Sequence, residues 1–105
     1  MPETFVISQK GLEVMKTDLG KMNWKDAKKA CENLGDDWRL PTREEFKTIF
    51  KYKYRIGSFK NARYWTIDQP GFFFINNLMY FFFDYGGAST LNKFYTAYVR
   101  AVRDL

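Results

Sequence analysis

The spacing of hydrophobic residues changes along the chain, from alternation near its start to a helical period after residue 23. Residues 4–7 and 12–15 alternate weakly, and Gly11 lies between them. This pattern predicts two short strands joined by a turn at residues 9–11. Residues 18–21 predict a second turn before the chain becomes helical.

Two helices are predicted next, each preceded by a residue that caps helix N-termini. Asn23 caps the first helix, and Asp26 suits the positive end of its dipole. The apolar stripe of this helix is formed by Trp24, Ala27, Ala30, Cys31 and Leu34. Thr42 precedes the second helix, residues 43–52, and Glu45 completes a capping box. The second helix is expected to bury Phe46, Ile49 and Phe50.

The segment between the two helices organises the rest of the chain. Gly35 suits the left-handed conformation that follows a helix C-terminus, because it has no Cβ to clash there. Pro41 disfavours helix at Leu40, so residues 38–40 are expected to be extended. One helix therefore ends, a short buried segment follows, and the next helix begins within a few residues.

Beyond residue 52 the pattern predicts strands and loops. We expect a strand at 63–67, a turn at 68–71, a hairpin formed by 72–75 and 78–84, a loop at 85–92 and a last strand at 94–103. The predicted fold class is α+β, with two helices packed on a twisted antiparallel sheet. The whole chain, residues 1–105, is expected to form a single domain whose first and last strands lie near each other.

Composition supports a folded chain with an aromatic core. Hydrophobic residues make up 46% of the 105 residues and aromatic residues 20%, which argues against disorder. The longest apolar run, residues 72–83, is interrupted by Asn76 and Asn77 and is too short to span a bilayer, so no membrane insertion is expected. The first residues do not resemble a signal peptide, which favours a cytoplasmic location. A leader ahead of residue 1 would instead indicate a secreted or surface protein.

The chain contains no histidine and one cysteine, Cys31. A Ser-His-Asp triad, a Cys-His dyad and a His- or Cys-rich zinc site are therefore excluded, and no disulfide can form within the chain. The single unpaired thiol favours a reducing compartment. We predict no catalytic residue, metal site or cofactor, because Asp36-Asp37 and Glu44-Glu45 suit a solvated loop and a helix start. Structural pairing with carboxylates or backbone carbonyls is expected for Arg39, Arg100 and Arg103.

Positive charge is concentrated in one stretch, residues 47–63. The net charge is +5, and this stretch contains six cations and no acid: Lys47, Lys51, Lys53, Arg55, Lys60 and Arg63. Residues 51–55 alternate cation and ring, so an extended conformation would give a basic face and an aromatic face. The stretch could bind phosphates while its rings stack on bases, or its tyrosines could pack on the core while the cations face water.

Residues 72–75 and 80–83 are apolar on both faces of their predicted strands. Such strands are usually covered on both sides. One face is expected to pack on the helices. The other face requires either a covering loop or a second copy of the chain, because an exposed apolar patch of this kind is an association site.

Four short blocks resemble a known protein family. They are Met22-Asn23-Trp24-Lys25-Asp26-Ala27 with Cys31 and Leu34, Asp37-Trp38-Arg39-Leu40-Pro41-Thr42 with Glu45-Phe46, Tyr64-Trp65-Thr66, and Val99-Arg100-Ala101-Val102-Arg103. In this order they resemble a family of bacterial domains of unknown function, typified by the C-terminal domain of a collagen-like adhesin. That family has a C-type-lectin-like fold and is distantly related to formylglycine-generating enzymes and retroelement variable proteins.

The resemblance implies a non-catalytic module that binds a protein or glycan through the loops after residues 64–65 and before the last strand. The candidate ligand-binding residues there are Asp68, Gln69, Tyr85, Ser89, Thr90, Asn92 and Tyr95. Binding is expected to be calcium-independent, since Gly71 follows Gln69-Pro70 where lectins place an oxygen ligand. The resemblance also places Cys31 against Ala101, where family members often have a second cysteine. The alternative function is nucleic-acid or polyanion binding by residues 47–63.

Overall fold

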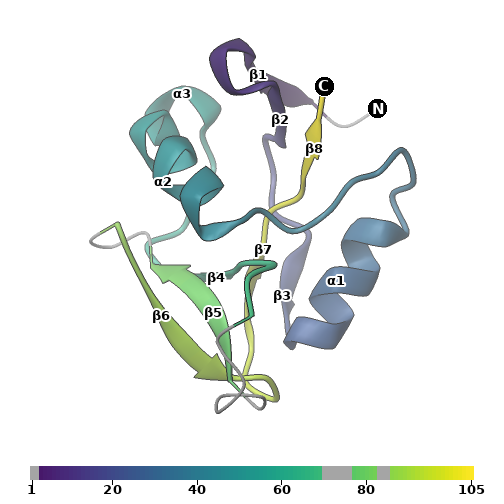
Figure 1. Cartoon of the computed structure of the whole chain (residues 1–105), viewed down its shortest axis with the longest axis vertical. Helices are drawn as coiled ribbons and strands as arrows, with labels where there is room; N and C mark the ends of the chain where they lie inside the picture. The colour runs from purple at the N-terminus through teal and green to yellow at the C-terminus, as the bar shows by residue number, and fades with distance from the viewer. Residues whose placement is uncertain (1–2, 70–76, 83–85) are drawn as a thin grey trace.

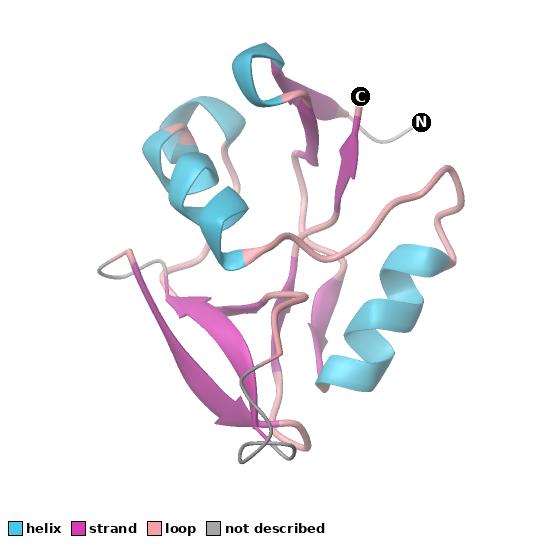
Figure 2. Ribbon diagram, in the orientation of Figure 1, coloured by secondary structure: helices cyan, strands magenta, loops and turns pink. Residues whose placement is uncertain are grey.

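The computed structural model describes residues 3–69, 77–82 and 86–105, which form an α+β fold with two sheets. Figure 2 shows helices on both sides of the strands that run through the centre of the fold. The elements in chain order are β1 (Thr4–Ile7), η1 (Ser8–Lys10), β2 (Leu12–Met15), β3 (Gly20–Met22), α1 (Trp24–Glu32), α2 (Arg43–Lys51), α3 (Lys53–Ile56), β4 (Arg63–Trp65), β5 (Asn77–Phe82), β6 (Gly87–Asn92), β7 (Ala97–Val99) and β8 (Val102–Asp104).

The smaller sheet joins the two ends of the chain. Its strand order is β1-β2-β8, and both pairings are antiparallel. The predicted hairpin at residues 4–15 is confirmed, with Gly11 left-handed at φ 60° after η1. The first and last strands share this sheet with β2 between them, and β1 and β8 lie at the same end of the molecule (Figure 1).

The larger sheet has the order β3-β7-β4-β5-β6. Its pairings are antiparallel except for β4 with β7, which run parallel. Two of its strands were not predicted. β3 lies where a turn was expected at residues 18–21, and β6 lies where a loop was expected at 85–92. The predicted strand at 72–75 lies outside the described residues.

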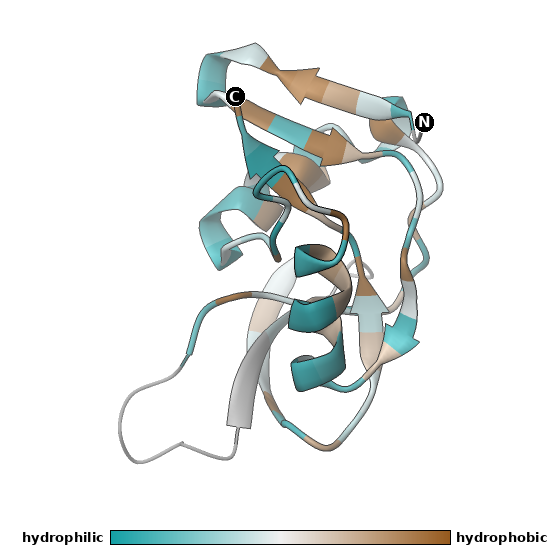
Figure 3. Cartoon of the chain, turned by 90° about the vertical axis from the view of Figure 1, so that its right-hand side faces the viewer, coloured by the Kyte–Doolittle hydropathy of each residue, from teal (hydrophilic) through white to brown (hydrophobic). Residues whose placement is uncertain are grey.

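Both long helices begin at the predicted caps. The Asn23 side chain accepts a hydrogen bond from the backbone of Asp26, and Thr42 and Glu45 form the complete capping box of α2. Ala27 and Cys31 are the buried residues of α1. Leu34 follows the helix and is exposed, so its predicted place in the buried stripe is wrong. Figure 3 shows strongly hydrophilic bands on α1 and long hydrophobic segments in the strands near the two termini.

The segment between α1 and α2 follows the predicted path and contains two further left-handed residues. Gly35 is left-handed at φ 73°, and Asp36 and Asp37 are left-handed as well, at 53° and 63°. Arg39 then forms an isolated antiparallel bridge with Val102, which confirms the extended segment. Trp38 is only 7% exposed and is stacked by the guanidinium of Arg103, whose Cζ lies 4.8 Å from the ring centroid.

The core consists of two clusters on opposite sides of the larger sheet. The cluster beside α1 includes Trp38, Trp65 and both Cys31 and Ala101, the two residues that the family resemblance brings together. The cluster beside α2 includes Phe46, Tyr64 and Phe81, and the rings of Phe46 and Phe81 stack with centroids 5.4 Å apart. Phe81 is thus a core residue, as one face of the Phe-rich strands was expected to be.

A buried arginine breaks the predicted last strand into β7 and β8. Arg100 is fully buried; its Nε donates to Asp18 Oδ1 at 2.8 Å, and its other nitrogens donate to the carbonyls of Met15, Gly57 and Ser58. The hydroxyl of Tyr64 donates to the other carboxylate oxygen of Asp18. The predicted bracing role of Arg100 is confirmed.

The stretch after α2 is also different from its prediction. Residues 53–56 form the short helix α3 rather than an extended segment, and β4 ends at Trp65 rather than at residue 67. In the described part of the chain, no helix is long and apolar enough to cross a membrane.

Candidate functional site

Three segments that are distant in sequence meet around Trp24, the first residue of α1. The indole Nε1 of Trp24 donates to the carbonyl of Thr66, just after β4, at 2.9 Å. The backbone N–H of Trp24 points at the carbonyl of Lys93, just after β6, at 3.5 Å. Trp24 therefore fixes the start of α1 against both loops that the sequence predicted as the ligand surface.

The turn between β6 and β7 presents two exposed rings. The Asn92 side chain accepts a hydrogen bond from the backbone N–H of Phe94 at 3.0 Å, and the backbone N–H of Tyr95 donates to the Asn92 carbonyl at 3.0 Å. This local bonding is typical of an Asn-initiated turn. Phe94 is 74% exposed and Tyr95 is 59% exposed, although both are large aromatic residues.

A hollow of about 370 Å³, the Trp24–Phe94 hollow, lies between this turn and the start of α1. Its lining is formed by Asn23, Trp24, Lys25, Asp26, Lys93 and Phe94. Two lysines lie over its rings: Lys28 Nζ is 4.7 Å from the centroid of a Trp24 ring, and Lys93 Nζ is 5.3 Å from that of Phe94. The hollow combines aromatic surface with hydrogen-bonding and charged groups, which is the usual character of a ligand pocket.

The predicted ligand-binding residues have different positions relative to this hollow. Asn92 and Tyr95 belong to the turn beside it, whereas Ser89 and Thr90 are exposed further back on β6. Asp68 accepts a hydrogen bond from the backbone N–H of Arg43 and therefore holds the start of α2. Gln69 is exposed, and Tyr85 lies outside the described residues.

Trp24 and Phe94 were missed as site residues. The helical spacing placed Trp24 in a core stripe, and it does pack on the core cluster beside α1 while it lines the hollow. Phe94 was assigned to a strand that in fact begins at Ala97. The signal for Phe94 was Asn92, because an asparagine side chain favours a turn by bonding the backbone two residues on.

Comparison of the sequence with models of known protein families assigns the chain to a family. The model of the family described as "Lcl C-terminal domain" matches residues 8–103 of the 105-residue chain. The chain belongs to the Lcl C-terminal domain family. No curated protein matches the chain. Both segments that line the Trp24–Phe94 hollow lie inside the matched range.

The basic stretch, residues 47–63, does not form one continuous cationic surface with a separate aromatic face. Residues 51–55 are largely helical, so they do not have the extended conformation in which the cations and the rings would lie on opposite faces. Tyr52 packs against Phe5, with ring centroids 6.0 Å apart, while Tyr54 is 90% exposed.

Most cations of the stretch lie close to rings or acids of the fold. Lys47 pairs with Glu44 at 3.2 Å. Ring centroids lie within 6 Å of the cationic groups of Lys53, Arg55, Lys60 and Arg63. Lys51 is exposed at the end of α2. Arg63 is the first residue of β4 in the larger sheet, and Lys60 lies in the loop before β4. Both are therefore separate from the cations on α2 and α3.

Arg39 and Arg103 pair with carboxylates, as the sequence analysis predicted for them. Arg39 binds Glu45 through two hydrogen bonds of 2.7 and 2.8 Å and also contacts Asp104. Burial alone would raise the pKa of Glu45, but the hydrogen bonds from Arg39 and from the Thr42 backbone outweigh it and lower that pKa below its usual value. Arg103 likewise binds Glu13 at 2.7 Å.

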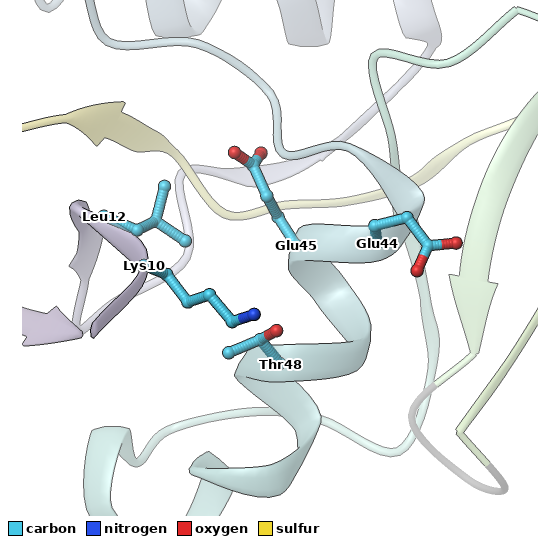
Figure 4. A pocket seen from close by; sticks show the side chains of 5 residues that line it. All are labelled: Lys10, Leu12, Glu44, Glu45 and Thr48. Carbon is cyan, nitrogen blue, oxygen red and sulfur yellow. The ribbon is translucent and has the colours of Figure 1, made fainter. Parts of the chain in front are cut away.

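A second, smaller hollow lies between η1 and α2 and has a volume of about 150 Å³. In Figure 4 the side chain of Lys10 extends toward Thr48, and the carboxylate of Glu44 points away from it. The carboxylate of Glu45 is bound to Arg39. Among the described residues, no three His, Cys, Asp or Glu side chains come together where they could hold a metal ion.

Cys31 is buried in the cluster beside α1. Burial, together with the neighbouring charge of Glu32, raises the pKa of its thiol to about 12. The thiol is therefore protonated at neutral pH, and since the thiolate is the nucleophilic form, Cys31 is inert in the folded domain.

Proposed function

We propose that this domain is a non-catalytic recognition module that binds a protein or glycan ligand at the Trp24–Phe94 hollow and the adjoining β6–β7 turn. The observation that carries the proposal is the exposure of Phe94 and Tyr95 at 74% and 59%, beside a hollow with an indole in its lining. Two large rings held in water by a hydrogen-bonded turn cost free energy unless a partner covers them.

The chemistry of the hollow suits binding by surface complementarity. Tryptophan and other aromatic residues are the commonest energetic centres of protein interfaces, because they bury a large area with few rotatable bonds. Lys25 and Lys93 add charged donors at the rim, and Asn23 adds an amide. The one thiol of the chain is buried and protonated, which supports recognition rather than covalent catalysis.

We extend this proposal to the fold family, the role of calcium and the location of the protein. A C-type-lectin-like fold and kinship with the collagen-like adhesin domain would place the ligand at these loops. Calcium-independent binding follows from Gly71, which has no side-chain oxygen to offer a metal. A cytoplasmic location accords with a single unpaired thiol.

The test compares two ring substitutions at the turn with one matched substitution elsewhere. Glycan arrays and capture from a native lysate would identify a ligand for the wild-type domain, and the variant Phe94→Ser with Tyr95→Ser should lose most of that binding. Tyr54→Ser is the control, because Tyr54 is 90% exposed but lies on α3. Unchanged binding by the double variant, with circular dichroism showing a folded domain, would refute the proposed site.

A second candidate function is polyanion binding by the α2–α3 surface. It is favoured by the exposure of Tyr54 and of Lys47, Lys51 and Arg55 on two consecutive helices. Binding of an oligonucleotide there would fall steeply with salt, because each neutralised phosphate releases counterions. Replacing Lys51, Lys53 and Arg55 together by Ser should abolish it, whereas the substitutions at the turn should not. We expect weak salt dependence and sensitivity to the turn instead.

A further inference from the structure

Strand β6 forms an open edge of the larger sheet. β6 is the last strand in the order β3-β7-β4-β5-β6 and pairs only with β5 among the described strands. Figure 1 shows it at the outer margin of the fold, with no labelled element beyond it. Within residues 3–69, 77–82 and 86–105, no backbone hydrogen bond reaches the outer side of β6 from another segment. Its outward N–H and C=O groups therefore have no backbone partner within these ranges, as is typical of an edge that can accept another strand.

The other sheet edges are shorter, and two of them are protected. β3 has three residues and carries the exposed Lys21. β8 has three residues, and its free side is met by the bridge from Arg39 to Val102. β1 has four residues. β6 has six, Gly87-Ala88-Ser89-Thr90-Leu91-Asn92, with no charge and no proline.

Natural sheet edges usually carry lysine, proline, a bulge or a covering segment, because a bare edge recruits other chains. The longest edge here lacks the sequence-based protections, although the chain as a whole contains 17 lysines and arginines. This distribution indicates an edge that is paired in the working state of the protein.

The side chains of β6 favour an identical strand as the partner. A foreign peptide added to a sheet edge is selected by pockets for its alternate side chains. Five hollows are well formed by residues 3–69, 77–82 and 86–105, and their linings contain no residue of β6. The exposed side chains of β6, Ser89 and Thr90, are small and uncharged. Two copies of this strand can approach closely without bringing like charges together, even though each chain carries a net charge of +5.

We propose that β6 pairs antiparallel with β6 of a second copy, so that the two five-stranded sheets become one continuous sheet across a two-fold axis. The axis is perpendicular to the sheet, and residues facing each other must belong to the same face. The pairing is therefore centred on either Ser89 or Thr90, which pairs residues 87–91 or 88–92 of each copy. Five facing pairs form about four to six main-chain hydrogen bonds. Because the strands are antiparallel, the two Trp24–Phe94 hollows lie toward opposite ends of the joint sheet.

This inference stands independently of the ligand proposed above. The experiment is sedimentation equilibrium over a concentration series, combined with hydrogen exchange of the β6 amides. The wild-type chain should show a monomer–dimer equilibrium, and the outward β6 amides should become more protected as concentration rises. Thr90→Lys should weaken the dimer by about tenfold or more, because in either register it places two ammonium groups at the two-fold axis or on the positions next to it.

Thr17→Lys is the matched control, since it adds the same charge at an exposed residue of the β2–β3 loop. It should leave the dimer unchanged, and both variants should melt like the wild type. A wild-type chain that stays monomeric up to millimolar concentration overturns the proposal. So does a dimer that Thr90→Lys leaves intact, or one whose formation does not protect β6, because either result places the contact elsewhere, for example on the Phe-rich strands.

Discussion

Replacing Arg100 by Met should destabilise the domain more than any surface substitution. The guanidinium is fully buried and binds Asp18 and three backbone carbonyls, with its Cζ 3.9 Å from the centroid of the Phe59 ring. Methionine fills much of the same volume but donates no hydrogen bond. The Asp18 carboxylate, whose side chain is only 11% exposed, would keep just its bond from Tyr64 among these partners.

The expected loss follows from what remains buried after the substitution. Removing one partner of a buried ion pair costs about 3–5 kcal/mol, mostly because the other charge stays desolvated and unpaired. A domain of this size has a free energy of unfolding of about 5–15 kcal/mol. A loss of about 4 kcal/mol corresponds to a decrease in Tm of roughly 15–30 °C.

Urea unfolding followed by tryptophan fluorescence measures this loss directly. Arg43→Met is the control, because Arg43 is exposed and its contact with Glu44 is 3.8 Å long; it should change stability by less than about 0.5 kcal/mol. Adding Asp18→Asn to Arg100→Met should recover part of the loss, since it removes the unpaired charge. An Arg100→Met variant that melts within a few degrees of the wild type would refute this account of the buried network.

Three further predictions concern the core and its ion pairs. Trp38→Ala should cost about 3–5 kcal/mol by leaving a cavity beside α1, measurable by thermal melting, and a Tm within a few degrees of wild type would contradict this. Cys31 should react with a thiol reagent only after unfolding, and stability should fall as pH rises from about 8.5 toward 12, because the unfolded thiol ionises first. The lowered pKa of Glu45 stabilises the fold above the ordinary value of about 4.3, and this contribution is lost as pH falls through the folded pKa. Glu45→Gln should therefore show a smaller drop in urea midpoint between pH 7 and pH 3 than the wild type.

Elements defined by local chemistry were predictable from the sequence. The caps Asn23 and Thr42 bond within their own first turns, so the start of each helix is determined by residues only three apart. The left-handed Gly35 and the extended residues before Pro41 follow from backbone sterics in the same way. The hairpin at the start of the chain is likewise closed by a short local turn.

Elements that depend on distant partners were not predictable. β3 is a strand because Lys21 and Met22 pair with Tyr98 and Ala97, far away in the chain. The Gly-, Ser- and Thr-rich β6 resembles a loop in composition and is a strand because β5 lies beside it. For the same reason the site was only half predicted, since the contact from Trp24 to Thr66 spans 42 residues.

The smaller sheet has a consequence for the order of folding. β2 pairs on one side with β1, its neighbour in sequence, and on the other with β8, and the Arg103–Glu13 bond closes a separation of 90 residues. During synthesis, which runs from the N-terminus, the β1–β2 hairpin emerges long before its third strand exists. An isolated hairpin is only marginally stable in water. A ribosome paused anywhere before residue 102 therefore holds a chain whose first strands still lack their third. Resistance to protease should appear abruptly once residues 102–104 have emerged.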